Sequence, residues 1–259
     1  MPLKRISFRV PPRAVLACIQ IPTDCVLDRE GPALVSKLEN VELRMQKMEF
    51  TSDAICAKTY FESASNLQRA AATLLPPHRC DVVGLACTSM SFTLGPERVD
   101  ALLSSACPGA KTTDMARAQA AAIAALGASR IALLTPYIQE LADANKVMLE
   151  ETGGIKVVRR ATMELDRDEL TTAVDEDTIV RWASELISGE RRDDNKAAPE
   201  ALVIGCSAFR ACEHGFISQL EEKLNLPVVT STQAFLWSML RIGGINDRIE
   251  GYGRLFEQC

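Results

Sequence analysis

The chain repeats its own landmarks at a nearly constant spacing, and this repeat is the feature that most restricts its fold. Two short apolar runs, DVVGLAC and ALVIGC, each end on a cysteine, Cys87 and Cys206, which lie 119 residues apart. Other matched positions, at offsets of 114 to 116, are Pro22 with Pro136, Met48 with Met163, and Gly127 with Gly243. Matched landmarks in the same order indicate a duplicated chain with two similar halves.

Each half consists of short apolar runs that alternate with helical patterns. We expect strands at 14–21, 41–50, 81–87 and 110–113, and again at 130–135, 155–165, 201–205 and 227–230. Such alternation favours parallel strands with helices on both faces of the sheet. The prediction is an α/β fold of two pseudo-symmetric halves, 1–127 and 128–259, each a four-stranded parallel sheet flanked by helices. The helix expected at 233–242 is a candidate to complete the first half, an exchange that the pattern leaves open.

The composition is that of a globular protein, with 47% hydrophobic and 24% charged residues among 259. No stretch approaches the roughly 18 apolar residues of a membrane span. The N-terminal residues do not resemble a secretion signal, so a cytoplasmic location is expected. A net charge of −5 with scattered basic residues gives no footprint for nucleic acid or an anionic membrane. The expected partners are a small molecule and further copies of the chain, as a homo-oligomer.

Nine cysteines form an odd set without a CxxC pair, which favours reduced thiols over a disulfide framework. His78 and His214 are the only histidines, and neither has the spacing of a zinc site. We therefore predict no metal. The glycine-rich phosphate loops GxGxxG and GxxxxGK[ST] are also absent from the sequence, so nucleotide binding lacks its usual motif.

Cys87 and Cys206 are the candidate catalytic residues because both follow a buried strand, at the sheet edge where open α/β folds bind ligands. If the halves face one another, one thiolate can attack carbon or remove a proton while the other thiol donates a proton. This chemistry needs a lowered thiol pKa, which a helix N-terminus and nearby amides can supply. Thr88, Ser89 and Ser207 follow the cysteines in loops that are expected to cradle a carboxylate. The alternative is that each cysteine is a buried small hydrophobe.

Four motifs carry a resemblance to a known family. They are ACTSMSF at 86–92, LLTPY at 133–137, GCSAF at 205–209 and PVVTSTQAFLW at 227–237. With these motifs in this order, the chain resembles the maleate isomerase and arylmalonate decarboxylase branch of the aspartate/glutamate racemase superfamily, over nearly its whole length. The resemblance implies two flavodoxin-like halves and a cofactor-independent enzyme that binds a carboxylate in the cleft between them.

The resemblance also implies roles for individual residues. Cys87 matches the thiolate that adds to the alkene in maleate isomerases, and Cys206 matches the thiol that protonates the neighbouring carbon. Thr88, Ser89 and Tyr137 match the groups that hold a substrate carboxylate in the decarboxylase branch, which keeps only the second cysteine.

The chain departs from its relatives where those carry side-chain amides. It has Thr23-Asp24-Cys25 after the first strand, Asp166-Arg167 after the sixth, and Ser231-Thr232-Gln233 in the last motif. These differences leave the substrate open, either because Arg167 and other groups recognise a different carboxylate or because the alignment slips by a residue. Thr23, Arg167 and Ser207 are accordingly predicted to contact the substrate.

The predicted function is cofactor-independent isomerisation of a small carboxylate by the two thiols, with cis–trans isomerisation of a maleate-like dicarboxylate as the leading case. An amino-acid or hydantoin racemase, or a lyase or decarboxylase of the same superfamily, is the enzymatic alternative. A carboxylate-binding or redox-sensing protein without catalytic activity is the alternative of another class.

Overall fold

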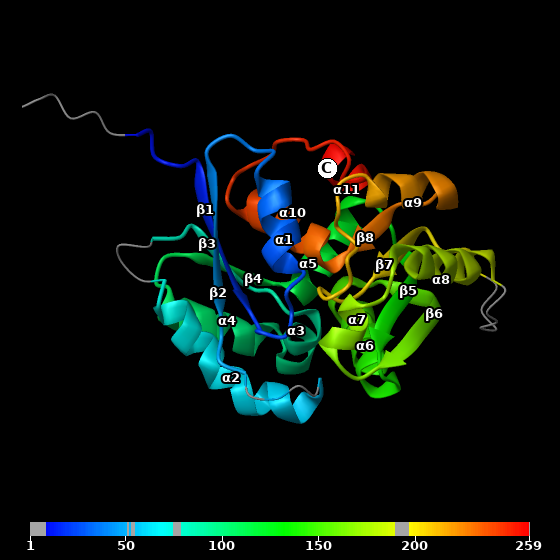
Figure 1. Ribbon diagram of the computed structural model, residues 1–259, viewed down its shortest axis with the longest axis horizontal. Coiled ribbons are helices and arrows are strands. Elements are labelled where there is room, and N and C mark those ends of the chain that lie inside the picture. Colours follow the sequence, from blue (N-terminus) through cyan, green and yellow to red (C-terminus); the bar gives the residue numbers. More distant parts are fainter. Residues whose placement is uncertain (1–8, 51, 53–54, 75–78, 190–196, 259) are drawn as a thin grey trace, which may run out of the picture.

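The computed structural model describes residues 9–50, 52, 55–74, 79–189 and 197–258, and within them it contains two four-stranded parallel sheets. The first sheet has the order β2-β1-β3-β4, and the second repeats it as β6-β5-β7-β8 (Figure 1). The predicted α/β fold with two similar sheets is therefore confirmed. The strand bounds are β1 Ala14–Gln20, β2 Val41–Lys47, β3 Val82–Leu85, β4 Lys111–Asp114, β5 Arg130–Tyr137, β6 Lys156–Leu165, β7 Ala201–Ile204 and β8 Val228–Thr230.

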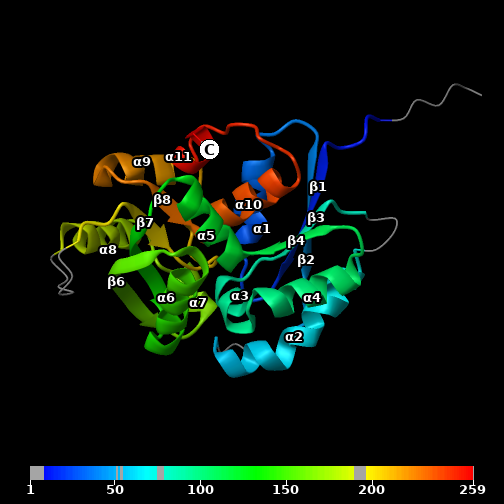
Figure 2. The same ribbon diagram turned by 180° about the vertical axis from the view of Figure 1, so that it is seen from behind.

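The central strands form where the sequence is continuously apolar. β1, β3 and β7 are buried along their whole length, as expected of parallel strands that are covered on both faces. β2 and β6 lie at the outer edges of their sheets and are only partly buried. On the first sheet, α1 (Leu27–Val35) and α10 (Ser231–Ile242) lie on one face, and α2 (Ala57–Ala72) and α4 (Pro96–Ala106) lie on the other (Figures 1 and 2). The catalytic candidates thus each follow a strand, β3 or β7, that is buried along its whole length.

The helices are α1 Leu27–Val35, α2 Ala57–Ala72, α3 Thr88–Leu94, α4 Pro96–Ala106, α5 Met115–Ala125, α6 Gln139–Gly153, α7 Asp168–Thr172, α8 Glu176–Ser188, α9 Phe216–Leu224, α10 Ser231–Ile242 and α11 Arg254–Gln258. Among the described residues, no helix is both long and apolar enough to cross a bilayer. The charged segment GERRDDNKAAP at 189–199 is typical of a solvated loop, and it falls largely on 190–196, which lie outside the described residues.

α10 packs on the sheet of the first half, although it belongs to the second half by sequence. It contacts β1, β3 and β4, and a Cβ atom built on Gly84 of β3 would lie 2.7 Å from the Phe235 ring. α5, the last helix of the first half, contacts α10, α6 and β8. The Gln119 side chain of α5 lies against Gly205, just after β7. The two halves are therefore joined through helices that cross between them.

Candidate active site

Cys87 lies where β3 ends and α3 begins. Its backbone is extended, with φ −150° and ψ 113°, and it is the N-cap residue of α3. The Ser91 hydroxyl donates a 2.7 Å hydrogen bond to the Cys87 carbonyl, and the Met90 N–H donates to the sulfur. The structure corrects one expectation, because Thr88 and Ser89 belong to the first turn of a helix and not to a loop. The helix N-terminus therefore points at the thiol from the very next residue.

The hydroxyls that follow Cys87 have different partners. Ser89 Oγ lies 3.7 Å from Cys87 Sγ and shares a 2.6 Å hydrogen bond with the Tyr60 hydroxyl of α2. The Thr88 hydroxyl donates instead to Met115 Sδ at 3.4 Å. The structure thus brings Ser89 and Tyr60 to the first thiol, whereas the Thr88 hydroxyl points toward α5.

Cys206 follows β7 and has a strained backbone, with φ +140° in a region that residues with a side chain rarely adopt. Its N–H donates a 2.9 Å hydrogen bond to Ser231 Oγ, at the start of α10. The Gln119 side-chain amide of α5 donates to the same oxygen at 2.9 Å. Ser231 therefore supports the strained residue, and Gln119 holds Ser231 in place.

Replacing Ser231 by alanine is expected to lower kcat by roughly 10- to 100-fold and to cost about 1–2 kcal/mol of stability, because the buried Cys206 N–H loses its acceptor. Ser238→Ala is the matched control, since Ser238 is also a buried serine of α10 and has no described hydrogen bond to the Cys206 loop. Steady-state kinetics and urea unfolding of both variants measure the two effects. Equal losses in the two variants would rule out a positioning role for Ser231.

Tyr137 lies beside the second thiol because of an irregularity in β5. The pairing of β5 with β6 shifts register between Thr135 and Tyr137, on either side of Pro136. Proline cannot donate a ladder hydrogen bond, so a bulge is a common place for it in a sheet. The buried Tyr137 hydroxyl interacts with the Cys206 thiol, and burial together with both thiols raises the pKa of Tyr137. Tyr137 is therefore a neutral hydrogen-bonding group at the thiols.

Thr23 and Ser207 bring two carboxyl groups into the site. Thr23 Oγ1 donates a 2.6 Å hydrogen bond to Asp168 Oδ2, which joins the end of β1 to the start of α7. The Ser207 hydroxyl hydrogen-bonds to the buried Asp24 side chain. The sequence did not predict Asp24 and Asp168 as site residues. In the structure they accept the hydrogen bonds of Ser207 and Thr23, whose hydroxyls were expected to contact the substrate.

Arg167 is not brought to the thiols. Its side chain is 50% exposed, and its Nε donates a 3.4 Å hydrogen bond to Asp166. Arg167 is the N-cap residue of α7, and the next residue, Asp168, is only 5% exposed. The position that faces the site is thus one residue further along the chain than the sequence pattern indicated.

Both thiols have a raised pKa, contrary to the lowered value expected from the helix N-terminus. Burial raises the pKa of Cys87 to about 12, and the nearby Asp168 adds to this effect. The pKa of Cys206 is raised by burial first and by Asp168 second. The amides of Met90 and Ala208 oppose these shifts but do not outweigh them. The two thiols are therefore protonated in this closed form of the protein.

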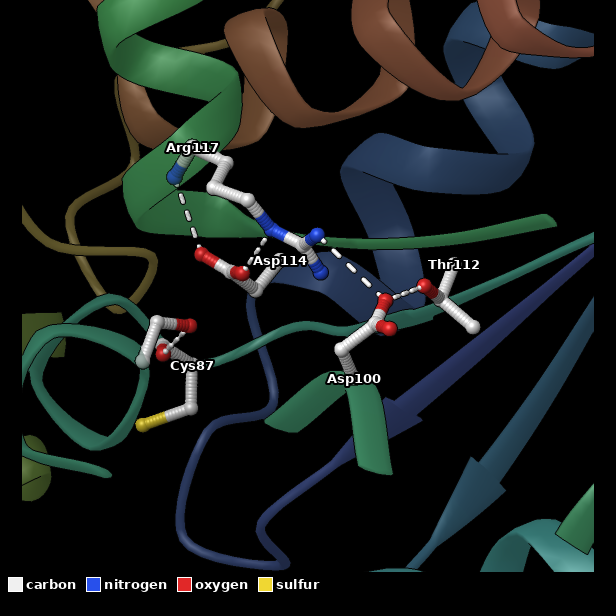
Figure 3. Close-up of polar contacts among 6 residues, drawn as sticks. Cys87, Asp100, Thr112, Asp114 and Arg117 are labelled. Carbon is white, nitrogen blue, oxygen red and sulfur yellow. Dashed lines mark hydrogen bonds and ion pairs between the residues drawn. The ribbon is translucent and has the colours of Figure 1, made fainter. Parts of the chain in front are cut away.

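Arg117, a basic residue near Cys87, forms ion pairs with carboxylates and does not contact the thiol. Arg117 of α5 pairs with Asp114 at 2.5 Å and with Asp100 at 3.5 Å, and Asp100 also accepts from Thr112. Figure 3 shows the Cys87 thiol pointing away from this group of side chains. Arg117 therefore fixes the junction of β4 with α5 and is not aimed at the thiol.

The site is closed, since Cys87 is 3% and Cys206 6% exposed. A cavity of about 550 Å³ lies at the opposite edge of the first sheet, where Cys80 and Lys111 are part of its lining. Within the described ranges, no three His, Cys, Asp or Glu side chains are grouped so that they could hold a metal ion.

The fold and the site together define a two-sheet α/β protein with a buried thiol at the end of the third strand of each half. The chain belongs to the arylmalonate decarboxylase family, whose sequence model matches residues 38–256. The family lies in the aspartate/glutamate racemase-like superfamily, so the resemblance stated above is confirmed.

Two curated relatives span most of the chain. An arylmalonate decarboxylase of Bordetella bronchiseptica is 29% identical over 183 residues, which cover 68% of this chain and 71% of that enzyme. A maleate isomerase of Nocardia farcinica is 24% identical over 266 residues, which cover 100% of this chain and 97% of that enzyme. These relatives confirm the prediction of an enzyme and support the isomerase class.

Solved structures confirm the fold. A Nocardia farcinica maleate cis-trans isomerase mutant with a covalently bound succinylcysteine intermediate matches with a TM-score of 0.82 at 20% identity, covering 95% of this chain and 99% of that one. A liganded arylmalonate decarboxylase mutant matches with a TM-score of 0.80 at 23% identity, covering 95% and 100%.

Proposed function

We propose that this protein is a cofactor-independent isomerase of a small carboxylate, with cis–trans isomerisation of a maleate-like dicarboxylate as its reaction. The observation that carries the proposal is the placement of Cys87 and Cys206, one from each half, in a common environment. The charges of both thiols raise the pKa of Tyr60 and of Tyr137, and the charge of Asp168 raises the pKa of both thiols, so these groups lie close to one another. The relatives named maleate isomerase, one of them with a covalently bound succinylcysteine intermediate, support this choice.

In the proposed reaction, the Cys87 thiol first releases its proton to solvent. The resulting thiolate forms a C–S bond to one alkene carbon, and Cys206 gives its proton to the neighbouring carbon. The former double bond, now single, rotates. Cys206 then takes the proton back while the C–S bond breaks, which restores the double bond in the trans form and the Cys87 thiolate. Ser89, Thr88 and Tyr137 are the proposed contacts for the substrate carboxylates, together with Thr23 and Ser207.

The direct test is proton NMR of purified, chelator-treated protein incubated with maleate, for which we expect the fumarate signal to grow at the expense of maleate. Heat-denatured protein is the control for uncatalysed conversion. No fumarate, together with solvent deuterium entering the α-carbon of aspartate or a hydantoin, would replace the leading case with the racemase alternative. The carboxyl groups of Asp24 and Asp168 favour that alternative, because they are suited to accept a hydrogen bond from a substrate N–H group.

The raised pKa of both thiols in the free protein also fits the non-catalytic alternative, in which the cysteines are inert. Both interpretations predict slow alkylation of the free protein by iodoacetamide, so turnover of maleate separates them: an inert pair of thiols gives none. The predicted homo-oligomer, the cytoplasmic location and the domain boundary at 127/128 remain predictions.

A further inference from the structure

The charged groups with the largest effect on the pKa of the two thiols are the carboxyls of Asp168 and Asp24, while two cations of the neighbouring segments are paired or exposed. Asp24 and Asp168 are both buried. Lys47 Nζ lies 2.7 Å from Asp28 and donates to the Asp24 carbonyl at 3.1 Å. Arg167 is exposed. A dianionic substrate that enters this site therefore meets carboxylates of its own sign in a region of low dielectric, where like charges repel strongly.

Asp168 is the carboxyl group most exposed to this repulsion, because among the charged groups it has the largest effect on the pKa of both thiols. Its hydrogen bond from Thr23 lowers its pKa and the nearby Asp24 raises it, but burial has the largest effect and places the pKa at about 6. The titratable groups that face it from the other elements are Asp24, Tyr60, Cys87 and Cys206. In the free protein at pH 7 to 8, Asp168 is therefore mostly ionised, yet it can take up a proton at small cost.

We propose that Asp168 is a specificity-determining residue that admits a second substrate carboxylate only by taking up a proton, so that a dicarboxylate binds together with one proton. This inference rests on the proposed function, because it assumes that a small carboxylate binds beside the thiols. The proton comes from solvent, resides on the Asp168 carboxyl while the ligand is bound, and returns to solvent on release. As an acid, Asp168 donates a hydrogen bond to the carboxylate that its ionised form repels.

The same step also affects the thiol. Ionised Asp168 raises the pKa of Cys87, so a proton on Asp168 removes one cause of that shift. Without that proton, the ionised Asp168 carboxyl and the bound dicarboxylate would both oppose formation of the Cys87 thiolate. Proton uptake by Asp168 therefore removes one of the two charges that oppose the thiolate in the loaded site.

The test is calorimetric titration with succinate, a dicarboxylate that lacks the reactive double bond, and with butanoate as the matched monocarboxylate. Titrations at pH 6, 7 and 8 in two non-phosphate buffers of different ionisation enthalpy give both the affinity and the number of protons taken up. We expect succinate binding to take up nearly one proton at pH 8 and to weaken by about tenfold between pH 7 and 8. Butanoate binding is expected to show neither effect.

Asp168→Asn and Asp166→Asn form a matched pair of variants, because both exchange a carboxylate for an amide in the same segment. Asp166 is exposed and pairs with Arg167, so its variant is expected to keep the proton uptake. Asp168→Asn is expected to bind succinate without proton uptake and with little pH dependence, and up to about a hundredfold more tightly than the parent protein at pH 8, because only about one in a hundred Asp168 carboxyls is protonated there. Thermal unfolding checks that both variants are folded.

The outcomes separate this inference from the proposed function. Succinate binding without proton uptake in the parent protein, or proton uptake that persists in Asp168→Asn, overturns the role of Asp168 and leaves the isomerase proposal standing. Failure of both succinate and butanoate to bind would overturn the proposed function and the inference with it.

Discussion

Cys206→Ser and Cys87→Ser are each expected to reduce turnover by at least about a thousandfold, but only the Cys206 variant should accumulate a covalent adduct. Serine has nearly the shape of cysteine, yet its hydroxyl is neither a comparable nucleophile nor a comparable acid. With Cys206 replaced, Cys87 can still add to the substrate and solvent can supply the proton, but the thiolate that removes this proton during elimination is missing, so the adduct persists. With Cys87 replaced, the C–S bond cannot form. Intact-mass spectrometry after incubation with maleate measures the adduct, and NMR measures turnover.

Cys25→Ser is the matched control for these variants, because Cys25 is exposed and carries no proposed role. It is expected to keep the activity of the parent protein. Substantial turnover in either Cys87→Ser or Cys206→Ser would show that the reaction does not need two thiols, and an adduct on another cysteine would assign the nucleophile elsewhere.

Gly84→Val is expected to destabilise the protein by roughly 3 kcal/mol or more, although valine is far better suited than glycine to a buried strand. The new Cβ would lie 2.7 Å from two ring atoms of Phe235 and 3.2 Å from Thr113. Because Gly84 lies in the middle of the first sheet and Phe235 holds α10 against it, the clash can be relieved only by moving the crossing helix. Urea unfolding, followed by circular dichroism, measures the loss.

Gly31→Ala is the control for Gly84→Val, since Gly31 lies in α1 and its new Cβ would meet only the ends of the Leu43 and Leu27 side chains. Alanine is favoured over glycine within a helix by about 1 kcal/mol, so this variant is expected to be close to neutral. A Gly84→Val protein as stable as Gly31→Ala would show that α10 is not held tightly on the first sheet.

The fold was predictable because each strand is marked by a short apolar run in the sequence, and the same order of runs occurs twice. The apolar runs before Cys87 and Cys206 identify the buried strands, and their shared position in the repeat identifies the two thiols. α3 was missed because Thr88 to Leu94 is a run of hydroxyl and apolar residues without a clear helical pattern, and its helix is stabilised by packing against α2, α4 and α5.

Asp168 was not predictable from its neighbours in sequence. It lies in a charged segment, DRDE, that is typical of a solvated turn. Its burial depends on Thr23, which is 145 residues away and belongs to the other half. The raised pKa of Cys87 has the same origin, because the local sequence shows the helix N-terminus but not the burial or the carboxyl group that outweigh it.

The crossing of α10 also means that the two halves cannot be treated as separable modules. A chain cut after Gly127 would yield an N-terminal fragment without the helix that covers Gly84, and a C-terminal fragment whose Ser231 has lost Gln119. Each fragment is therefore expected to be unstable alone, and activity is expected to return only when the two are refolded together. Each half therefore depends on the other for its own packing, and neither is expected to be exchangeable without its partner.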